Sequence, residues 1–114
     1  MNIGSSLSAL NAFSTQMNIT ANNIANVNTD GYKSSSAVIE TGQGQTVRAN
    51  LIKDNSQGFM TPNKSAANGM EELSNVDMVK EMTQLIPTQN AYDANLKAIV
   101  TNYQMQGTLL SMFA

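Results

Sequence analysis

The chain has 114 residues, a formal net charge of -2, and neither cysteine nor histidine. This length allows one domain with a modest core, and the missing thiolate and imidazole exclude the commonest catalytic and transition-metal sites. The weak charge argues against nucleic-acid binding, and no apolar run reaches the roughly 18 to 20 residues of a membrane span. No Lys or Arg precedes Lys33, which is unlike a secretory signal, so we expect any export to use another route.

The N-terminal segment carries apolar residues on a 4,3 spacing, which predicts a helix of about 22 residues with a coiled-coil seam. Its opposite face carries neutral polar side chains such as Asn11, Thr15 and Asn18, with no charge. That face is either the solvated outside of a two-helix core or a surface buried against neighbouring copies, where small neutral groups are cheap to desolvate. The seam positions, interrupted by Ser14, are Ile3, Leu7, Leu10, Met17, Ala21 and Ile24.

This helix is predicted to end within the segment ANNIANVNTDGYK, residues 21–33. Asn26, Asn28 and Asp30 before Gly31 indicate a helix terminus and a tight turn, because Asn and Asp close Asx-turns and tolerate the left-handed conformation. Asn22 and Asn23 lie within the last turns of the helix itself, so the tight turn that follows does not explain why asparagine occupies these two positions. Their amides could pair with backbone groups of an adjacent element.

The same segment resembles the amino-terminal signature of the bacterial flagellar rod and hook proteins, usually A-N-N-I-A-N-x-N-T-x-G-[FY]-K. The match is continuous over 13 residues, including the double Asn and the Gly31-Tyr32-Lys33 end. Asp30 stands where many relatives have Pro, and Asp also suits a turn.

The middle segment, residues 34–74, changes character. Two short alternating runs around TGQGQ, at 37–39 and 47–52, predict a small β-hairpin. Residues 54–58 and 62–69 have the composition of turns and loops. Gly42-Gln43-Gly44 lacks the spacing and the Lys of a phosphate-binding loop. The adjacent Glu71 and Glu72 diverge in direction, which argues against a paired acid-base site.

A second helix is predicted from near Asn75, because Ser74 and Asp77 have the spacing of a capping box. Pro87 is expected to kink or break this helix. After Lys97 no charged residue follows, so the end of the chain is as neutral as its beginning. A 4,3 rhythm of about five heptads runs through Met78, Met82, Leu85, Gln89, Tyr92, Leu96, Ile99, Tyr103, Gln106, Leu110 and Phe113.

The stretch SNVDMVKEMTQLIPTQNAYDANLKAI, residues 74–99, is similar to the carboxy-terminal signature of the same family. The resemblance implies a structural subunit of the flagellar basal-body rod, closest to the short proximal-rod subunits, since only roughly 40 residues separate the two signatures. It implies terminal helices paired near the axis of a helical tube. The implied partners are other rod subunits, copies of the chain itself and the flagellar type III export apparatus, with export lacking a cleaved signal peptide.

We therefore expect a mainly α fold in which long N- and C-terminal helices form an antiparallel coiled coil, with a short β-hairpin and loop segment between them. Three regions are expected, at 1–33, 34–74 and 75–114. No catalytic, cofactor-binding or metal-binding residue is predicted, and no nucleic-acid or small-molecule partner. The residues expected at subunit contacts are Ile3, Leu7, Leu10, Met17, Asn22, Asn23, Ile24, Asn26, Asn28, Gly31, Tyr32, Met82, Leu85, Gln89, Tyr92, Asn95, Leu96, Ile99, Tyr103 and Leu110.

Two other functions fit parts of the pattern. A free-standing helical adaptor would bind one partner helix in a groove and stay monomeric or dimeric at all concentrations. A cell-wall hydrolase would need a carboxylate pair, and Asp77 and Glu81 lie one turn apart, but capping and solvation explain both residues better. The methionines of the second helix favour adaptable packing over a cofactor pocket.

Overall fold

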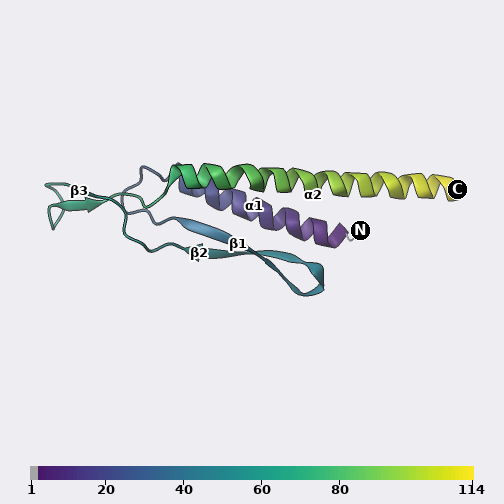
Figure 1. Cartoon of the computed structure of the whole chain (residues 1–114), viewed down its shortest axis with the longest axis horizontal. Coiled ribbons are helices and arrows are strands. Elements are labelled where there is room, and N and C mark those ends of the chain that lie inside the picture. The colour runs from purple at the N-terminus through teal and green to yellow at the C-terminus, as the bar shows by residue number, and fades with distance from the viewer. Residues whose placement is uncertain (1–2) are drawn as a thin grey trace.

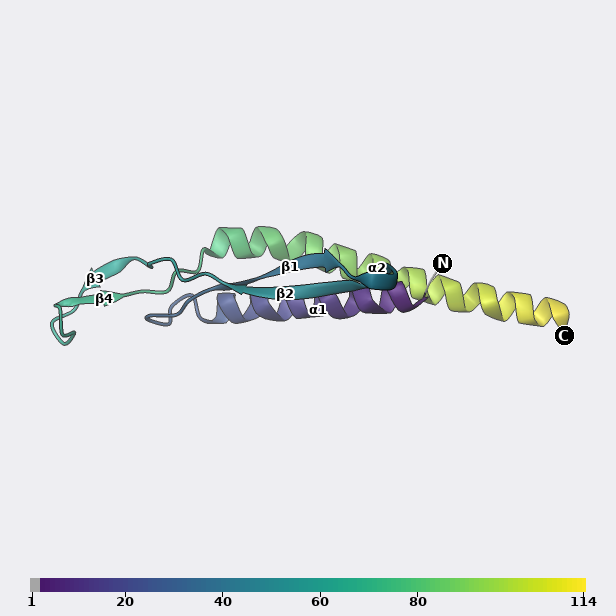
Figure 2. The same cartoon turned by 90° about the horizontal axis from the view of Figure 1, so that it is seen from below.

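The computed structural model describes residues 3–114 and is elongated, measuring 77 × 24 × 17 Å. Helices α1 and α2 lie side by side and run in opposite directions, with the β1–β2 hairpin against α1 (Figure 1). A second hairpin, β3–β4, stands at the end of the molecule away from the C-terminus (Figure 2). In chain order the elements are α1 (Ile3–Ala25), β1 (Ser35–Thr41), the 3-10 turn η1 (Gln43–Gln45), β2 (Val47–Lys53), β3 (Met60–Pro62), β4 (Met70–Glu72) and α2 (Met78–Phe113).

Helix α1 ends where the asparagine-rich segment begins. The N–H of Asn26 reaches the carbonyls of both Asn22 and Asn23, at 3.1 Å each, and the chain then turns through residues 26–31. Gly31 has φ +69°, a left-handed conformation that glycine adopts without a side-chain clash. The predicted helix terminus and turn are therefore present.

The β1–β2 hairpin is antiparallel, with Ser35 opposite Lys53 and Thr41 opposite Val47. Ala37 is buried, whereas Val38 and Glu40 beside it are exposed, so alternate residues face α1 and solvent. The predicted hairpin is confirmed. It needs α1 for stability, since an isolated two-stranded hairpin is marginal in water.

The β3–β4 hairpin was not predicted, and the expectation of loops alone between the first hairpin and α2 is wrong. Its strands pair Met60 with Glu72 and Pro62 with Met70, around a turn at residues 63–69. Three-residue strands carry too little alternation to be read from sequence, and Pro and Asn there favour the loop interpretation.

Helix α2 begins later than predicted and is not interrupted. Asp77 is its N-cap, and the carboxylate accepts hydrogen bonds from the N–H groups of Val79 and Lys80. Ser74 instead accepts from Val76 in the approach to the helix. The helix continues through Pro87, so the expected break is wrong, and whether Pro87 kinks the helix stays a prediction.

The predicted antiparallel coiled coil is also wrong, because the 4,3 seams do not face each other. Met82 is 55% exposed and Leu110 is 73% exposed, whereas the buried positions of α2 within residues 78–113 are Glu81, Thr88 and Asn102. Along the seam of α2, half-buried positions such as Leu85 and Tyr92 alternate with exposed ones such as Met82 and Leu96. The fold is therefore two antiparallel helices plus two small hairpins, without a hydrophobic knobs-into-holes core.

A hydrogen-bonded bridge of polar side chains connects the two helices and the first hairpin. The residues that α1 buries are Ala9, Leu10, Ala12, Thr20 and Asn23. Thr88 of α2 donates to Gln16 of α1 at 3.1 Å, and Gln16 in turn donates to the carbonyl of Ala37 in β1. Alanine lets the helices approach closely, and hydrogen bonds satisfy the buried polar groups.

Candidate subunit-interaction surfaces

Asn23 joins the end of α1 to the first strand. Its side chain is fully buried, with 0% of its surface exposed. The amide nitrogen donates to the carbonyl of Ser35 at 2.6 Å, and the amide oxygen accepts from the N–H of the same residue at 3.0 Å. The Tyr32 hydroxyl donates to that oxygen at 3.3 Å. A side-chain amide thus replaces a neighbouring strand at this end of β1.

The other asparagines of the turn act differently. Asn22 is exposed, and its carbonyl accepts from the Asn26 side chain at 2.8 Å. Asn26 also accepts from the Thr29 hydroxyl, which holds the turn closed. Asn28 is exposed. The predicted pairing of an Asn amide with the backbone of another element is therefore found at Asn23 and not at Asn22.

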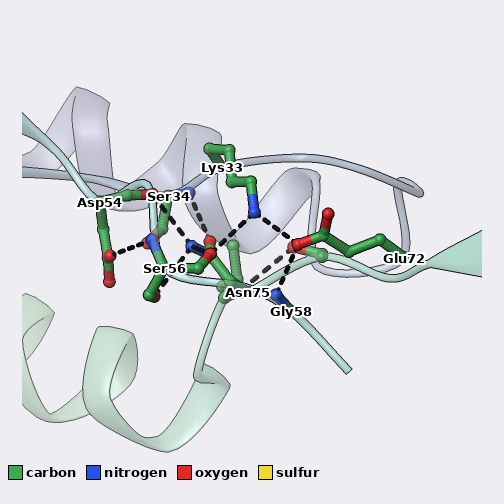
Figure 3. A network of polar contacts seen from close by, with 9 residues as sticks. Lys33, Ser34, Asp54, Ser56, Gly58, Glu72 and Asn75 are labelled. Carbon is green, nitrogen blue, oxygen red and sulfur yellow. Dashed lines mark hydrogen bonds and ion pairs between the residues drawn. The ribbon is translucent and has the colours of Figure 1, made fainter. Parts of the chain in front are cut away.

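A polar junction ties the exit of α1 to the approach of α2, through Lys33, Glu72 and Gly58 (Figure 3). The Lys33 ammonium contacts the Glu72 carboxylate at 2.5 Å, and the same carboxylate oxygen accepts from the N–H of Gly58 at 2.6 Å. The Lys33 side chain and then the Gly58 N–H lower the pKa of Glu72 by stabilising its charged form.

Asn75 is the second centre of this junction (Figure 3). Its side-chain oxygen accepts from the N–H of Ser34 at 2.7 Å, and its nitrogen donates to the carbonyls of Asp54 and Ser56 at 3.0 Å each. Hydrogen bonds from the backbone and then the side chain of Ser56 lower the pKa of Asp54. One amide therefore holds together three segments that lie far apart in the sequence.

Backbone hydrogen bonds reinforce the junction. Gly31 donates to the carbonyl of Glu72 at 2.8 Å, and Asn75 donates to that of Tyr32 at 3.2 Å. Gly58 lies so close to Leu73 that an added Cβ would stand 2.1 Å from its carbonyl oxygen. The two terminal segments are thus joined through loops, where periodicity offers no signal.

The predicted contact residues divide between the inside and the outside of the chain. Whether they meet other subunits stays a prediction. Those that are buried or half-buried within the chain are Ile3, Leu10, Met17, Asn23, Ile24, Asn26, Tyr32, Leu85, Tyr92, Asn95 and Ile99. Those that are exposed are Leu7, Asn22, Asn28, Gly31, Met82, Gln89, Leu96, Tyr103 and Leu110.

The C-terminal part of α2 extends beyond the N-terminal end of α1 (Figures 1 and 2). Every residue from 103 to 114 is exposed, and none of them is charged. We call residues 103–113 the overhang. Its large apolar side chains are Tyr103, Met105, Leu109, Leu110, Met112 and Phe113.

Sequence reasoning missed the polar stripe of α2 that faces α1. Glu81, Thr88 and Asn102 are buried, and Asn95 on the same spacing is half-buried. A seven-residue repeat of polar residues was the available signal, but apolar periodicity hid it.

The suggested carboxylate pair is not arranged for catalysis. The Asp77 carboxylate caps α2, while Glu81 is buried. Within residues 3–114 no group of three or more acidic side chains is placed to hold a metal ion. In the same residues no helix is long and apolar enough to cross a membrane.

Comparison with protein families matches both ends of the chain. Residues 3–33 match the family described as flagella basal body rod protein, and residues 67–112 match flagellar basal body rod FlgEFG protein C-terminal. The chain belongs to the flagellar basal body rod proteins. Both matched segments meet at the polar junction, since Lys33 ends the first and Glu72 and Asn75 lie in the second. No curated protein matches the chain.

Proposed function

We propose that this rod-family chain is a structural subunit that assembles with other axial subunits and with copies of itself into a hollow tube that transmits torque. Contacts between different faces of successive copies do not close, and they therefore build a helical filament. The flagellar type III export apparatus would pass the chain before it folds against its neighbours.

The overhang is the observation that supports this proposal most directly. Phe113 is 87% exposed and Leu110 is 73% exposed, on the part of α2 that extends beyond α1 (Figure 1). Monomeric soluble proteins seldom leave a contiguous apolar patch of several hundred Å² in water. Neighbouring subunits would cover this surface and gain about 25 cal/mol for each Å² of apolar area.

The neutral face of α1 supports the same proposal. Asn11, Thr15 and Asn18 are exposed, and no charge lies on that face. Burial of neutral polar groups costs less than burial of Lys or Glu, provided that each group finds a hydrogen bond. A crowded assembly can supply those partners.

Replacement of Leu110 and Phe113 by Glu tests the proposal in the flagellated cell. Burial of two carboxylates in a subunit contact is costly, so the variant should be expressed and exported but should not build rods, and the cells should not swim. Asn90→Glu, at an exposed position of α2 outside the overhang, is the matched control and should swim normally. Normal motility of the double variant would refute the proposal.

A further inference from the structure

Three hydrogen bonds show which backbone N–H and carbonyl groups of the β1–β2 hairpin point away from the partner strand. Ser35 uses its N–H and carbonyl on Asn23, and Val47 donates to the Ser8 hydroxyl at 3.0 Å, so both residues face away from the partner strand. In an antiparallel pair such outward positions recur every second residue. The backbone groups of Ala49, Leu51 and Lys53 therefore also point away from β1.

Parts of the other strand edges in the described residues are closed. Asn23 and Gln16 cover β1 at Ser35 and Ala37. In the second hairpin, outward-facing Pro62 has no N–H, and the outward carbonyl of Glu72 accepts from Gly31. Natural proteins close edges in this way to prevent unwanted strand pairing.

Among the described residues, the edge of β2 from Ala49 to Lys53 is the longest open run, with three consecutive outward positions. The described residues provide no hydrogen bond to the outward groups of Ala49, Leu51 and Lys53. Large apolar side chains lie on both faces of this edge, since Leu51 is 64% exposed and Ile52 is 51% exposed. A hollow of about 340 Å³, lined by Ile19, Asn22 and Leu51 among others, lies beside it. An added strand would satisfy the backbone and cover these side chains.

We propose that this edge binds the same edge of a second copy, forming an antiparallel β2–β2 pair with its two-fold axis at Leu51. The chain itself offers a matching open edge of three consecutive outward positions. In this pairing Leu51 faces Leu51 of the second copy, and Ala49 faces Lys53 of the second copy. The proposed contact joins the two hairpins into a four-stranded sheet.

Charge selects this register. Arg48 and Asp54 lie on the solvent face of the hairpin, and the described residues give Arg48 no ion pair. With the axis at Leu51, Arg48 stands opposite Asp54 of the second copy, and the symmetry produces this pair twice. An axis at Asn50 would place Arg48 opposite Ile52, and an axis at Ile52 would place it opposite Ser56.

The pairing is closed, so it produces a dimer and not a filament. The β2–β2 dimer is therefore separate from the rod contacts proposed above, and it would form between subunits that are not assembled into the tube. It also does not involve the overhang, which lies on α2. Tests of the two proposals can consequently fail independently.

Single-cysteine cross-linking tests the register, because the chain contains no cysteine of its own. Opposed residues in a hydrogen-bonded antiparallel pair have Cα atoms about 5.5 Å apart, which suits a disulfide. Under mild oxidation Leu51→Cys should link to itself at least about tenfold faster than Ala49→Cys, whose Cα atoms would lie roughly 14 Å apart across the axis. Equal rates for the two variants would overturn the proposal.

Sedimentation of the purified full chain carrying Leu110→Glu and Phe113→Glu, which prevent association through the overhang, provides a second measurement that does not need cysteine. The dimer dissociation constant should rise by about tenfold or more in Arg48→Glu, since two attractive pairs become repulsive. The double variant Arg48→Glu with Asp54→Arg should restore the value of the background chain. Circular dichroism should show unchanged helicity, because Arg48 is exposed. In this background, a chain with Arg48 and Asp54 unchanged that stays monomeric, or charge variants that associate as strongly as it does, would refute the pairing.

Discussion

Asn23 and Ser35 make a two-point contact in which one side-chain amide satisfies both backbone groups of one strand residue. The contact fixes the start of β1 on the end of α1. It also explains why an asparagine, a poor residue for a helix interior, is placed in the last turns of α1.

Asn23→Ala should destabilise the chain by about 1–3 kcal/mol, because it leaves the N–H and carbonyl of half-buried Ser35 without their partners. Urea unfolding followed by circular dichroism measures this change. The adjacent Asn22 is exposed, and its side chain makes no such contact, so Asn22→Ala should change stability by less than about 0.5 kcal/mol. Equal effects at both positions would contradict this role of Asn23.

The Lys33–Glu72 contact should make stability depend on pH in the acid range. The folded-state pKa of Glu72 is lowered from its ordinary value of 4.5, so its contribution is complete above that value and is lost as the pH falls through the folded pKa. Urea midpoints measured from pH 7 downward should therefore fall less steeply for Glu72→Gln than for the wild type. Asp54, whose pKa is also lowered, will still supply part of the slope in this variant. Parallel slopes for the two proteins would exclude the contribution of Glu72.

Gly58 should not tolerate a side chain, because a Cβ at this position would overlap the Leu73 carbonyl. Gly58→Ala should cost about 1–3 kcal/mol through displacement of the backbone at the junction. At Gly107, on the overhang, an added Cβ would meet nothing within 4 Å, so Gly107→Ala should be neutral or stabilising. Thermal unfolding of the two variants compares them directly, and a neutral Gly58→Ala would contradict the close packing.

The cap of α2 should be replaceable by residues that accept the same hydrogen bonds. Asp77→Ala should lower stability by about 1 kcal/mol, whereas Asp77→Asn should retain most of it. Helicity and urea midpoints provide the measurement. A large loss in both variants would indicate that the negative charge, and not the cap, is what matters.

Local chemistry made α1, its asparagine-rich end and the first hairpin predictable. Asn26 and Gly31 act through their own neighbours in the chain, so sequence alone indicates the turn. The helix interface could not be predicted in the same way, since apolar periodicity selected the Met82 and Leu110 face while Thr88 and Asn102 are the residues buried. A helix face that contacts other subunits has the same apolar periodicity as a face buried within the chain, so the sequence pattern does not distinguish them.

The polar junction could not be predicted either. Lys33 and Glu72 are 39 positions apart in the sequence, and Ser34 and Asn75 are 41 positions apart. These residues meet through loops, and only the three-dimensional path of the chain brings them together. The family resemblance marked Lys33 and Asn75 as signature residues without giving their roles. The structure shows that Lys33 and Asn75 hold the end of α1 and the beginning of α2 in position through the polar junction.

The central claim is that the overhang remains uncovered until other subunits contact it. Sedimentation velocity combined with circular dichroism over a concentration series tests it most directly, performed in an Arg48→Glu background so that the β2 edge does not contribute. We predict association with rising helicity in that background, and its loss when Leu110 and Phe113 are also changed to Glu. A fully helical monomer at every concentration, unaffected by the two Glu substitutions, would contradict the claim.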